Sequence, residues 1–476
     1  MGEVCQKLKS ETMKIISKLI ILFMISFCVN AQEISGKWNG KIQAGETTIE
    51  FVFTISNSQG ELNTSMAIPA RNLTSLKAKE TSYENGKLLI DGSNSGWQYS
   101  GIYQEEKQVF EGVFKEGVNE LPLNLTRGDI KEVTRKKRPQ EPKGPVPYRT
   151  EEVKFKNTSA GIELAGTLTL PVNINKAPVV ILITGSGPQN RDEEIYGHKP
   201  FLVLADHLTR NGIAVLRYDD RGVNESTGNF AEATTADFAT DVVAAVDFLK
   251  QRNDIDFDKI GLVGHSEGGI IAPMVAADSS NDIAFLISLA GTGVSGYETN
   301  LLQILHAAKG QVPDMVAYEE FIRGVLDIAS MPGDLKVVRQ ELREYYLSSE
   351  FFNNAISPNA DKETILKSLV EQRTSVWQRF FYNYNPADMF EKVKCPVLSL
   401  NGSLDTQVFA NVNQAGIRNA LIKGGNQAYV IKELEGLNHL FQKAKTGEMS
   451  EYNNIQTTIE PEVLKLVTSW IKDGMN

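Results

Sequence analysis

One serine in the chain stands where it could act as a nucleophile. Ser266 lies in the segment Gly264-His265-Ser266-Glu267-Gly268, which has the pattern G-x-S-x-G. An apolar run at 260–263 precedes this segment and a helix-like pattern follows it, so the serine is expected on a sharp strand-to-helix turn. The two glycines remove side chains that would collide there. The pattern predicts attack of the serine hydroxyl on a carbonyl carbon.

A serine hydroxyl needs a base, and the chain has only five histidines. His265 belongs to the turn itself, and His306 falls in a long helical insertion. His198 and His207 precede the serine in the chain. Only His439 follows the last predicted strand, where a loop reaches the same sheet edge as the serine. His439 is therefore the predicted general base.

The acid that orients this histidine is expected after the predicted strand Val397–Leu400. Asp405 fits, because Gly402 can turn the chain and point the carboxylate back toward the imidazole. Asp388 is the rival acid, but it precedes the strand and would lie at the wrong edge of the sheet. Asp405 is thus predicted to hold the tautomer of His439 and to stabilise its imidazolium.

An acyl-transfer enzyme must also stabilise an oxyanion. One donor is expected to be the backbone N–H of Glu267, the residue after the serine. The second is expected in the turn after Val179–Ile183, where Pro188 has no N–H, so Gly187 and Gln189 both remain candidates. The Glu267 side chain is expected to be solvated or paired locally. The alternative is that it binds a positive substrate group such as a free amine.

No cofactor or metal is expected. Asp254, Asp256 and Asp258 alternate like calcium ligands, but the glycine and the terminal glutamate of an EF-hand loop are missing. The segment from Gly291 to Gly296 spells a dinucleotide fingerprint, yet it follows a late strand instead of opening a first βαβ unit.

From residue 149 to 476 the chain alternates apolar runs with helix-period segments, which is typical of a parallel sheet with helices on both faces. The predicted strands are Val179–Ile183, Ala214–Tyr218, Ile260–Val263, Ala284–Leu289, Val397–Leu400 and Tyr429–Leu434. The interval at about 296–390 has helical patterns and no strand. Because one crossover needs far fewer residues, this interval is expected to form a cap over the sheet edge.

Residues 33–127 show short alternating strands punctuated by turns, which predicts a small β-barrel or sandwich. The predicted strands include Gly36–Ile42, Ile49–Ile55, Leu88–Asp91, Trp97–Tyr103, Val109–Phe114 and Leu121–Leu125. The aromatic residues of this segment are expected to fill a core. Residues 128–148 are rich in proline and charge and are expected to be a linker, with the basic run from Arg135 to Arg138 solvated.

Residues 1–31 are expected to be a signal peptide that directs export to the periplasm or the medium. Lys14 and Lys18 precede an apolar run of 11 residues, Leu19–Val29, which is too short for a stable membrane span. A lipid anchor on Cys28 is disfavoured by the bulky Phe27 before it. Removal of the leader would leave one cysteine of three, so no intramolecular disulfide is expected.

The amino-acid composition restricts the classes of molecule that this protein is expected to bind. Lys and Arg number 49 against 59 Asp and Glu, a net charge of −10, which argues against a dedicated nucleic-acid binder. The expected partner is a small-molecule ester or a short acyl substrate. The oligomeric state does not follow from the sequence.

Taken together, these motifs resemble the α/β-hydrolase superfamily, in particular the bacterial carboxylesterase and serine-peptidase-like group with a β-rich N-terminal domain. The resemblance covers about Tyr148 to the end. It rests on Gly185-Ser186-Gly187-Pro188, Tyr218-Asp219-Asp220-Arg221-Gly222, the serine turn, Asn401–Asp405 and Gly436–Phe441. It implies an α/β-hydrolase fold in which Asp219, Asp220 and Arg221 brace a turn. Asn224 stands where the related pattern has glycine, and asparagine tolerates a left-handed turn nearly as well.

The resemblance implies a serine hydrolase that cleaves carboxylic esters through an acyl-enzyme on Ser266, with Asp405 and His439. A serine peptidase or amidase is the alternative, because the same machinery cleaves amides when the histidine can protonate an amine. A non-catalytic binding protein is the third hypothesis.

Overall fold

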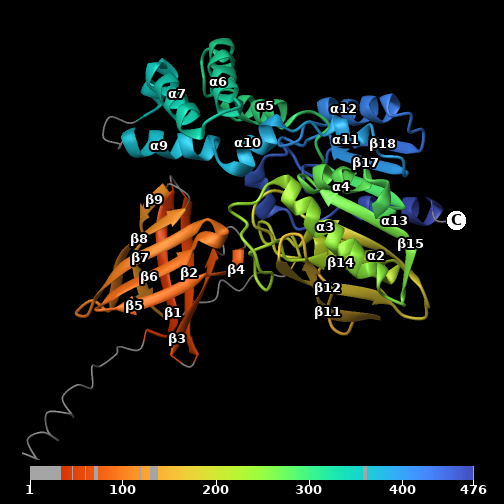
Figure 1. Cartoon of the computed structure of the whole chain (residues 1–476), viewed down its shortest axis with the longest axis horizontal. Coiled ribbons are helices and arrows are strands. Elements are labelled where there is room, and N and C mark those ends of the chain that lie inside the picture. The colour runs from red at the N-terminus through yellow and green to blue at the C-terminus, as the bar shows by residue number, and fades with distance from the viewer. Residues whose placement is uncertain are drawn as a thin grey trace, which may run out of the picture.

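The computed structural model describes residues 34–44, 47–58, 60–68, 73–116, 119–128, 138–356 and 362–474. The predicted leader and residues 135–137 of the basic run lie outside these ranges. Within them, the strands form a 10-stranded N-terminal antiparallel sheet and an 8-stranded mixed sheet flanked by helices (Figure 1).

The N-terminal sheet curls into a half-barrel with the strand order β4-β3-β2-β1-β10-β8-β7-β6-β5, and β9 pairs with β8. Its edges approach each other, because the hydroxyl of Thr81 on β5 donates to that of Thr64 on β3 at 2.9 Å. The strands are β1 (Gly36–Ala44), β2 (Thr47–Ser58), β3 (Glu61–Ile68), β4 (Leu73–Lys77), β5 (Glu80–Glu84), β6 (Lys87–Gly92), β7 (Trp97–Gln104), β8 (Val109–Glu116), β9 (Asn119–Pro122) and β10 (Leu125–Arg127). The sequence pattern does not predict β3, β4 and β5, because each mixes polar residues into its apolar positions, and it merges β9 with β10.

The half-barrel core is aromatic, as the sequence predicts. Trp38, Phe53 and Trp97 are buried, and the indole N–H of Trp38 donates to the carbonyl of Ile34 at 2.8 Å. The rings of Trp38 and Phe110 meet edge-on with centroids 4.7 Å apart, a favoured arrangement for aromatic pairs.

The second sheet has the order β11-β12-β14-β13-β15-β16-β17-β18. In this sheet β12 is antiparallel to both neighbours, and β13 to β18 are parallel. This is the strand order of an α/β-hydrolase, so the predicted fold class is confirmed. The strands are β11 (Tyr148–Asn157), β12 (Ile162–Pro171), β13 (Ala177–Ile183), β14 (Ala214–Tyr218), β15 (Ile255–His265), β16 (Phe285–Leu289), β17 (Val397–Gly402) and β18 (Tyr429–Leu434). The antiparallel hairpin β11–β12 is not among the predicted strands.

Helices cover both faces of this sheet. Side chains of α2 (Pro200–Arg210) and α13 (Pro461–Gly474) belong to the apolar cluster on one face, and those of α3 (Thr235–Lys250), α4 (Gly268–Ala276) and α12 (Ala410–Lys423) to the cluster on the other. The interval between β16 and β17 is helical throughout its described part, as predicted for the cap. It contains α5 (Gly296–Ala308), α6 (Met315–Ser330), α7 (Leu335–Ser348), α8 (Glu350–Ala355), α9 (Lys362–Arg373), α10 (Val376–Asn383) and α11 (Ala387–Phe390).

One residue of the predicted linker corrects the expectation of a solvated run. Arg138 is buried, and its guanidinium donates to the carbonyls of Ile455 at 2.8 Å and Tyr196 at 3.0 Å. A guanidinium has five donors, so it can hold several loop carbonyls at once. Arg138 therefore ties the segment before β11 to the loops that follow β13 and β18.

The half-barrel contacts the domain that holds the second sheet through the loop after β14. Val223 of this loop is buried within the half-barrel core. The hydroxyl of Ser95 donates to the carbonyl of Gly222 at 3.0 Å, and the N–H of Phe230 donates to the carbonyl of Asn94 at 2.9 Å. The half-barrel thus packs against a loop that follows a strand of the second sheet.

Candidate active site

Ser266 occupies the turn between β15 and α4. Its φ of +52° lies in the left-handed region, which non-glycine residues avoid unless the surroundings enforce it. Its N–H donates to the carbonyl of Leu289 on the neighbouring strand at 2.9 Å. A Cβ on Gly264 would collide with the carbonyl of Gly268, which explains the glycine at that position. The sequence folds here into the strained turn that exposes a serine above a sheet.

The predicted acid and base are paired. His439 Nδ1 and Asp405 Oδ2 are 2.7 Å apart, and both residues are buried. The other oxygen of Asp405 accepts the backbone N–H groups of Gln407 and Val408, each at 2.8 Å. The carboxylate is thus held in place, and the bond at Nδ1 leaves Nε2 of His439 for chemistry.

The turn and the histidine loop meet at the carboxyl edge of the sheet. The rings of His265 and His439 lie 4.8 Å apart between centroids, and His265 Nε2 donates to the backbone carbonyl of His439 at 3.1 Å. Two other histidines are engaged elsewhere: His198 contacts Thr458 and Tyr452, and His306 pairs with Glu448. His439 is thus held beside the serine turn.

One of the two candidates for the second oxyanion donor is occupied. The N–H of Gln189 donates to Asp220 Oδ2 at 2.8 Å, so the expectation that it could face an oxyanion is wrong. Gly187 has a φ of +93°, and among the described residues nothing accepts a hydrogen bond from its N–H. In the described part of the chain, nothing accepts a hydrogen bond from the N–H of Glu267 either. Glu267 and Gly187 therefore remain as the candidate pair.

The Glu267 side chain is not solvated, contrary to one expectation. It is buried, and its Oε1 accepts the hydroxyl of Thr235 and the indole N–H of Trp377, each at 2.7 Å. Burial raises the pKa of the Glu267 carboxyl, while bonds from Thr235, Trp377 and Ser186 act in the opposite direction. Because Trp377 belongs to α10, this carboxyl joins the cap to the serine turn. The side chain is thus paired inside the fold, and its role toward a substrate amine stays a prediction.

Sequence reasoning missed a second buried acid beside the site. Glu193 Oε1 lies 2.8 Å from His265 Nδ1 and also accepts the N–H of Gly185 at 2.8 Å. Gly185 in turn packs against Ser266, because a Cβ on Gly185 would lie 3.2 Å from the serine Cβ. One carboxylate thus links the loop after β13, the serine turn and, through His265, the loop of His439. The sequence feature that could have indicated this acid is the charged run from Arg191 to Glu194.

The ring of His265 faces an acceptor on each side, a carboxylate at Nδ1 and a carbonyl at Nε2. Only the doubly protonated imidazolium can donate to both. Burial alone would lower the pKa of His265, but the Glu193 carboxylate, the His439 carbonyl and Asp405 together raise it.

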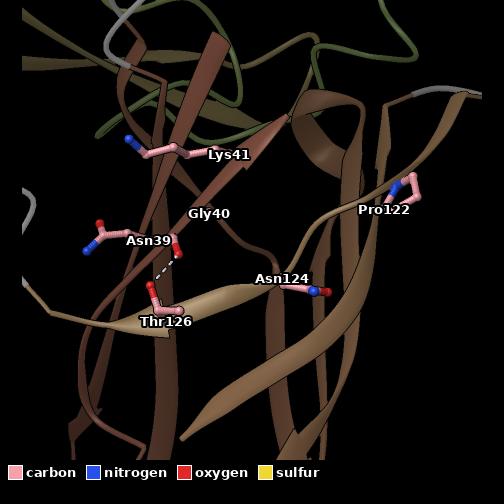
Figure 2. Close-up of a pocket in the computed structure, with 6 residues that line it drawn as sticks. All are labelled: Asn39, Gly40, Lys41, Pro122, Asn124 and Thr126. Atoms are coloured by element: carbon pink, nitrogen blue, oxygen red, sulfur yellow. Dashed lines mark hydrogen bonds between the residues drawn. The ribbon is translucent and has the colours of Figure 1, made fainter. Parts of the chain in front are cut away.

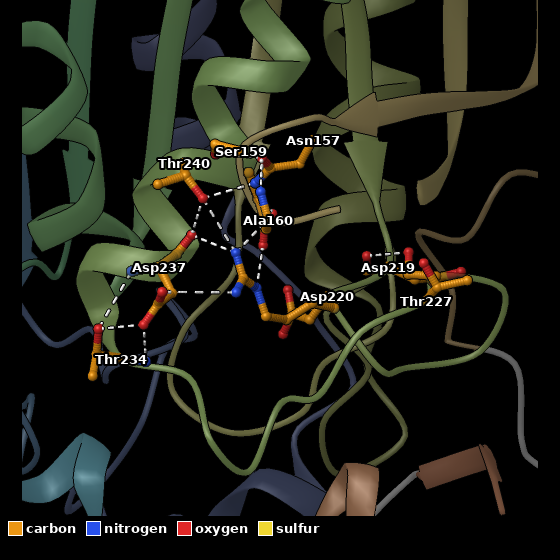
Figure 3. A network of polar contacts seen from close by, with 12 residues as sticks. Asn157, Ser159, Ala160, Asp219, Asp220, Thr227, Thr234, Asp237 and Thr240 are labelled. Atoms are coloured by element: carbon orange, nitrogen blue, oxygen red, sulfur yellow. Dashed lines mark hydrogen bonds and ion pairs between the residues drawn. The ribbon is translucent and has the colours of Figure 1, made fainter. Parts of the chain in front are cut away.

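The cluster after β14 braces the turn, as the resemblance implies. Arg221 donates from Nε to Asp241 on α3 at 2.8 Å and from Nη2 to the carbonyl of Asp237 at 2.6 Å. Figure 3 shows Asp237 and Thr240 of α3 beside the turn that contains Asp220. Asp220 accepts the hydroxyl of Thr184 at 2.7 Å. Burial raises the pKa of the Asp220 carboxyl in spite of this bond. Asn224 adopts a φ of +46°, which confirms the expected left-handed turn.

A hollow of about 380 Å³ lies on the half-barrel between β1 and the segment around β9 and β10 (Figure 2). Its lining residues are Asn39, Gly40, Lys41, Pro122, Asn124 and Thr126. The hydroxyl of Thr126 donates to the carbonyl of Asn39 at 3.3 Å. This lining offers no nucleophile paired with a base, in contrast to the edge of the second sheet.

Within the described ranges no three His, Cys, Asp or Glu side chains gather as metal ligands would. Across the same ranges, every helix is too short or too polar to cross a membrane.

The fold and the arrangement around Ser266 define an α/β-hydrolase. Residues 160–419, more than half of the chain, match the model of the family described as X-Pro dipeptidyl-peptidase (S15 family). The chain belongs to this family of hydrolases and is an enzyme of the α/β-hydrolase fold.

Shorter stretches resemble two curated proteins. The chain is 34% identical over 125 residues to esterase EstD of Thermotoga maritima, covering 26% of this chain and 30% of the relative. It is 35% identical over 92 residues to an acyl transferase of Photobacterium leiognathi, covering 19% and 28%. Each match thus spans less than a third of the relative's length.

Two solved structures are similar to about two thirds of this chain. Est1E from Butyrivibrio proteoclasticus, solved with ferulic acid bound, is 20% identical with a TM-score of 0.39, covering 68% of this chain and 97% of that one. The α/β hydrolase GrgF from a Penicillium species is 16% identical with a TM-score of 0.43, covering 69% and 99%.

Proposed function

We propose that this enzyme hydrolyses carboxylic esters through an acyl-enzyme intermediate on Ser266. The observation that carries the proposal is the buried pair of His439 and Asp405, with 2.7 Å between Nδ1 and Oδ2, at the sheet edge where Ser266 occupies its strained turn. Esterase EstD of Thermotoga maritima, by its name, supports ester chemistry for a related sequence.

In this mechanism the Ser266 hydroxyl attacks the ester carbonyl while His439 Nε2 accepts its proton. The N–H groups of Glu267 and Gly187 donate to the oxyanion as it forms. When the carbon–oxygen bond to the leaving group breaks, His439 returns the proton to the departing alkoxide. A water molecule then attacks the acyl-enzyme, with His439 again as base, and releases the carboxylic acid and the free serine.

The first test is covalent labelling by a fluorophosphonate probe, followed by an assay with short p-nitrophenyl esters. Wild-type protein is expected to label at Ser266 and to turn over the esters. Ser266→Ala should lose both properties and keep its circular dichroism spectrum. Ser288→Ala, which changes a buried serine on the neighbouring strand, is the control and should still label. Unchanged turnover in Ser266→Ala would refute the proposal, and wild-type protein that neither labels nor turns over would favour a binding protein.

A second candidate function is hydrolysis of peptides, which the family match favours because its description is that of an X-Pro dipeptidyl-peptidase. The same residues would act, with His439 protonating an amine instead of an alkoxide. A panel of X-Pro aminoacyl naphthylamides beside matched esters distinguishes the two functions. A higher kcat/KM on the amides would reverse the order.

We also infer export, on the sequence of the leader alone, since residues 1–31 lie outside the described ranges. The measurement is the N-terminal sequence of mature protein expressed in a bacterial host, with cell fractions compared. A mature chain that begins near residue 32 in the periplasm or medium is expected, and a cytoplasmic chain with its leader intact would overturn the inference.

A further inference from the structure

The cap contains an arginine that lacks an acidic partner. Arg373, the last residue of α9, is partly buried, and among the described residues no carboxylate lies within ion-pair distance of its guanidinium. Its Nη1 donates to the side-chain carbonyl of Asn300 at 2.8 Å and to the hydroxyl of Tyr382 at 3.3 Å. Its buried Nε–H has no hydrogen-bond partner within the described chain.

The groups around this guanidinium are neutral. Tyr318, Tyr346 and Tyr382 lie close enough to feel its charge, and burial raises the pKa of each of these phenols, so all three stay protonated at neutral pH. The carbonyl end of α9 supplies only about half a negative charge. A buried cation is expensive unless an anion compensates it, and arginine is the side chain best suited to bind a carboxylate with two parallel bonds.

The helices that hold Arg373 also contact the catalytic machinery. Asn300 lies one turn before Gln303 on α5, and Gln303 donates to the carbonyl of Gln407 at 2.9 Å, in the loop of Asp405. On the other side, Trp377 donates to Glu267, the neighbour of Ser266. Trp377 is four residues from Arg373, at most roughly 14 Å along the chain. The guanidinium is therefore carried by the part of the cap that is bonded to both sides of the candidate site.

Arg379, a second arginine of the cap, has a different set of partners. Among the described residues, Arg379 on α10 also has no acidic partner. Its two Nη groups donate to the carbonyls of Ala329 and Met331, at the C-terminal end of α6. Those bonds secure one helix end to another, as a structural arginine does. Arg373 instead contacts a side-chain amide and phenols, groups that also suit an anionic ligand.

From this geometry we propose that Arg373 determines specificity by binding a carboxylate on the substrate, remote from the scissile carbonyl. The proposal rests on the proposed function of Ser266 and names its substrate class, which is esters or amides that carry a negative charge remote from the reacting carbon. Two sources share this chemistry: the free carboxylate of a dicarboxylic acid monoester, and the C-terminal carboxylate of a short peptide.

The test compares substrates that differ only in charge. For the ester source, the pair is monoethyl glutarate and the ethyl ester of glutaramic acid, followed by pH-stat titration. For the peptide source, the pair is Ala-Pro-Ala and its C-terminal amide. The preference of wild-type enzyme, expressed as the ratio of kcat/KM for the charged and neutral members, is expected to be at least about tenfold for one pair. That pair identifies the source of the carboxylate.

Arg373→Gln should reduce this ratio by roughly 10- to 100-fold, and Arg373→Lys, which keeps the charge but loses the bidentate geometry, should reduce it less. Arg379→Gln is the matched control and should leave the ratio as in wild type. If Arg373→Gln lowers kcat/KM equally for both members of a pair, Arg373 only supports the cap and the proposal is wrong.

A binding measurement separates this proposal from the catalytic one. Calorimetric titration with glutarate should show binding to wild-type protein and a loss of at least about tenfold in affinity for Arg373→Gln. Cleavage of the neutral ester without any charge preference would leave the proposed function standing and overturn the carboxylate site. If no substrate is cleaved, the glutarate titration still decides: loss of binding in Arg373→Gln supports the site, and equal or absent binding overturns it.

Discussion

The half-barrel and the carboxyl edge of the second sheet bury opposite kinds of side chain. The first buries aromatic rings such as Phe53 and Trp97, and its core residues gain free energy by leaving water. The second buries Glu193, Asp220 and Glu267, and Glu267 directly follows Ser266 in the chain. Burying acids costs free energy that hydrogen bonds only partly offset, and the raised pKa of Asp220 and Glu267 reflects this cost. The half-barrel core therefore contributes mainly to stability, whereas the sheet edge holds polar side chains in a fixed arrangement at a cost in stability.

The largest expected effect is a loss of activity when the acid at the sheet edge is changed. Asp405→Asn keeps the shape of the acid but removes the charge that selects the tautomer of His439, so ester turnover should fall about ten-thousandfold. The assay is kcat/KM on a p-nitrophenyl ester. Asp388→Asn, a change at the exposed rival acid, should have little effect. A larger loss in Asp388→Asn would reassign the acid.

The next effect tests the apolar region through stability. Phe53 is fully buried, so Phe53→Ala should destabilise the half-barrel by about 3–5 kcal/mol, measured by denaturant unfolding with tryptophan fluorescence. Ile102→Ala, at a side chain that is 57% exposed on the same module, should change stability by less than about 0.5 kcal/mol. Turnover of small esters should persist in both variants below the unfolding transition. A folded Phe53→Ala protein without activity would show that the two regions are not separate.

The smallest expected effect is on the pH dependence of stability at the sheet edge. Because the folded-state pKa of His265 is raised, its ion pair with Glu193 stabilises the protein fully below about pH 6.5, and that contribution is lost as the pH rises through the raised pKa. Glu193→Gln should therefore lower stability by about 1–3 kcal/mol near pH 6 and by less at alkaline pH. The measurement is Tm against pH.

Glu194→Gln is the matched control for this pH dependence. Glu194 is also buried, but it pairs with Lys199 at 3.4 Å instead of a histidine, so its substitution should cost a similar amount at pH 6 and pH 9. If the two variants show the same pH profile, the role assigned to His265 is wrong.

Much of the fold follows from local patterns. Each of the parallel strands β13 to β18 contains a run of mostly apolar residues, and each predicted run overlaps the strand observed. The hairpin β11–β12 and the strands β3 to β5 were harder to predict because their residues mix polar and apolar types, and their pairing depends on distant partners. Arg138 shows the same limit, since the carbonyls it binds belong to segments up to 317 residues away.

Residue types at short range and their order along the chain were enough to predict the serine turn, the order of serine, acid and histidine, and the α/β class. Only the tertiary structure decided which N–H of the loop after β13 is engaged, that His265 lies between Glu193 and the His439 carbonyl, and that the cap places Trp377 on Glu267. The physical reason is that each of these contacts joins elements far apart in the chain. The residues next to a carboxylate or an N–H in the sequence do not indicate which distant group will bond to it in the folded protein.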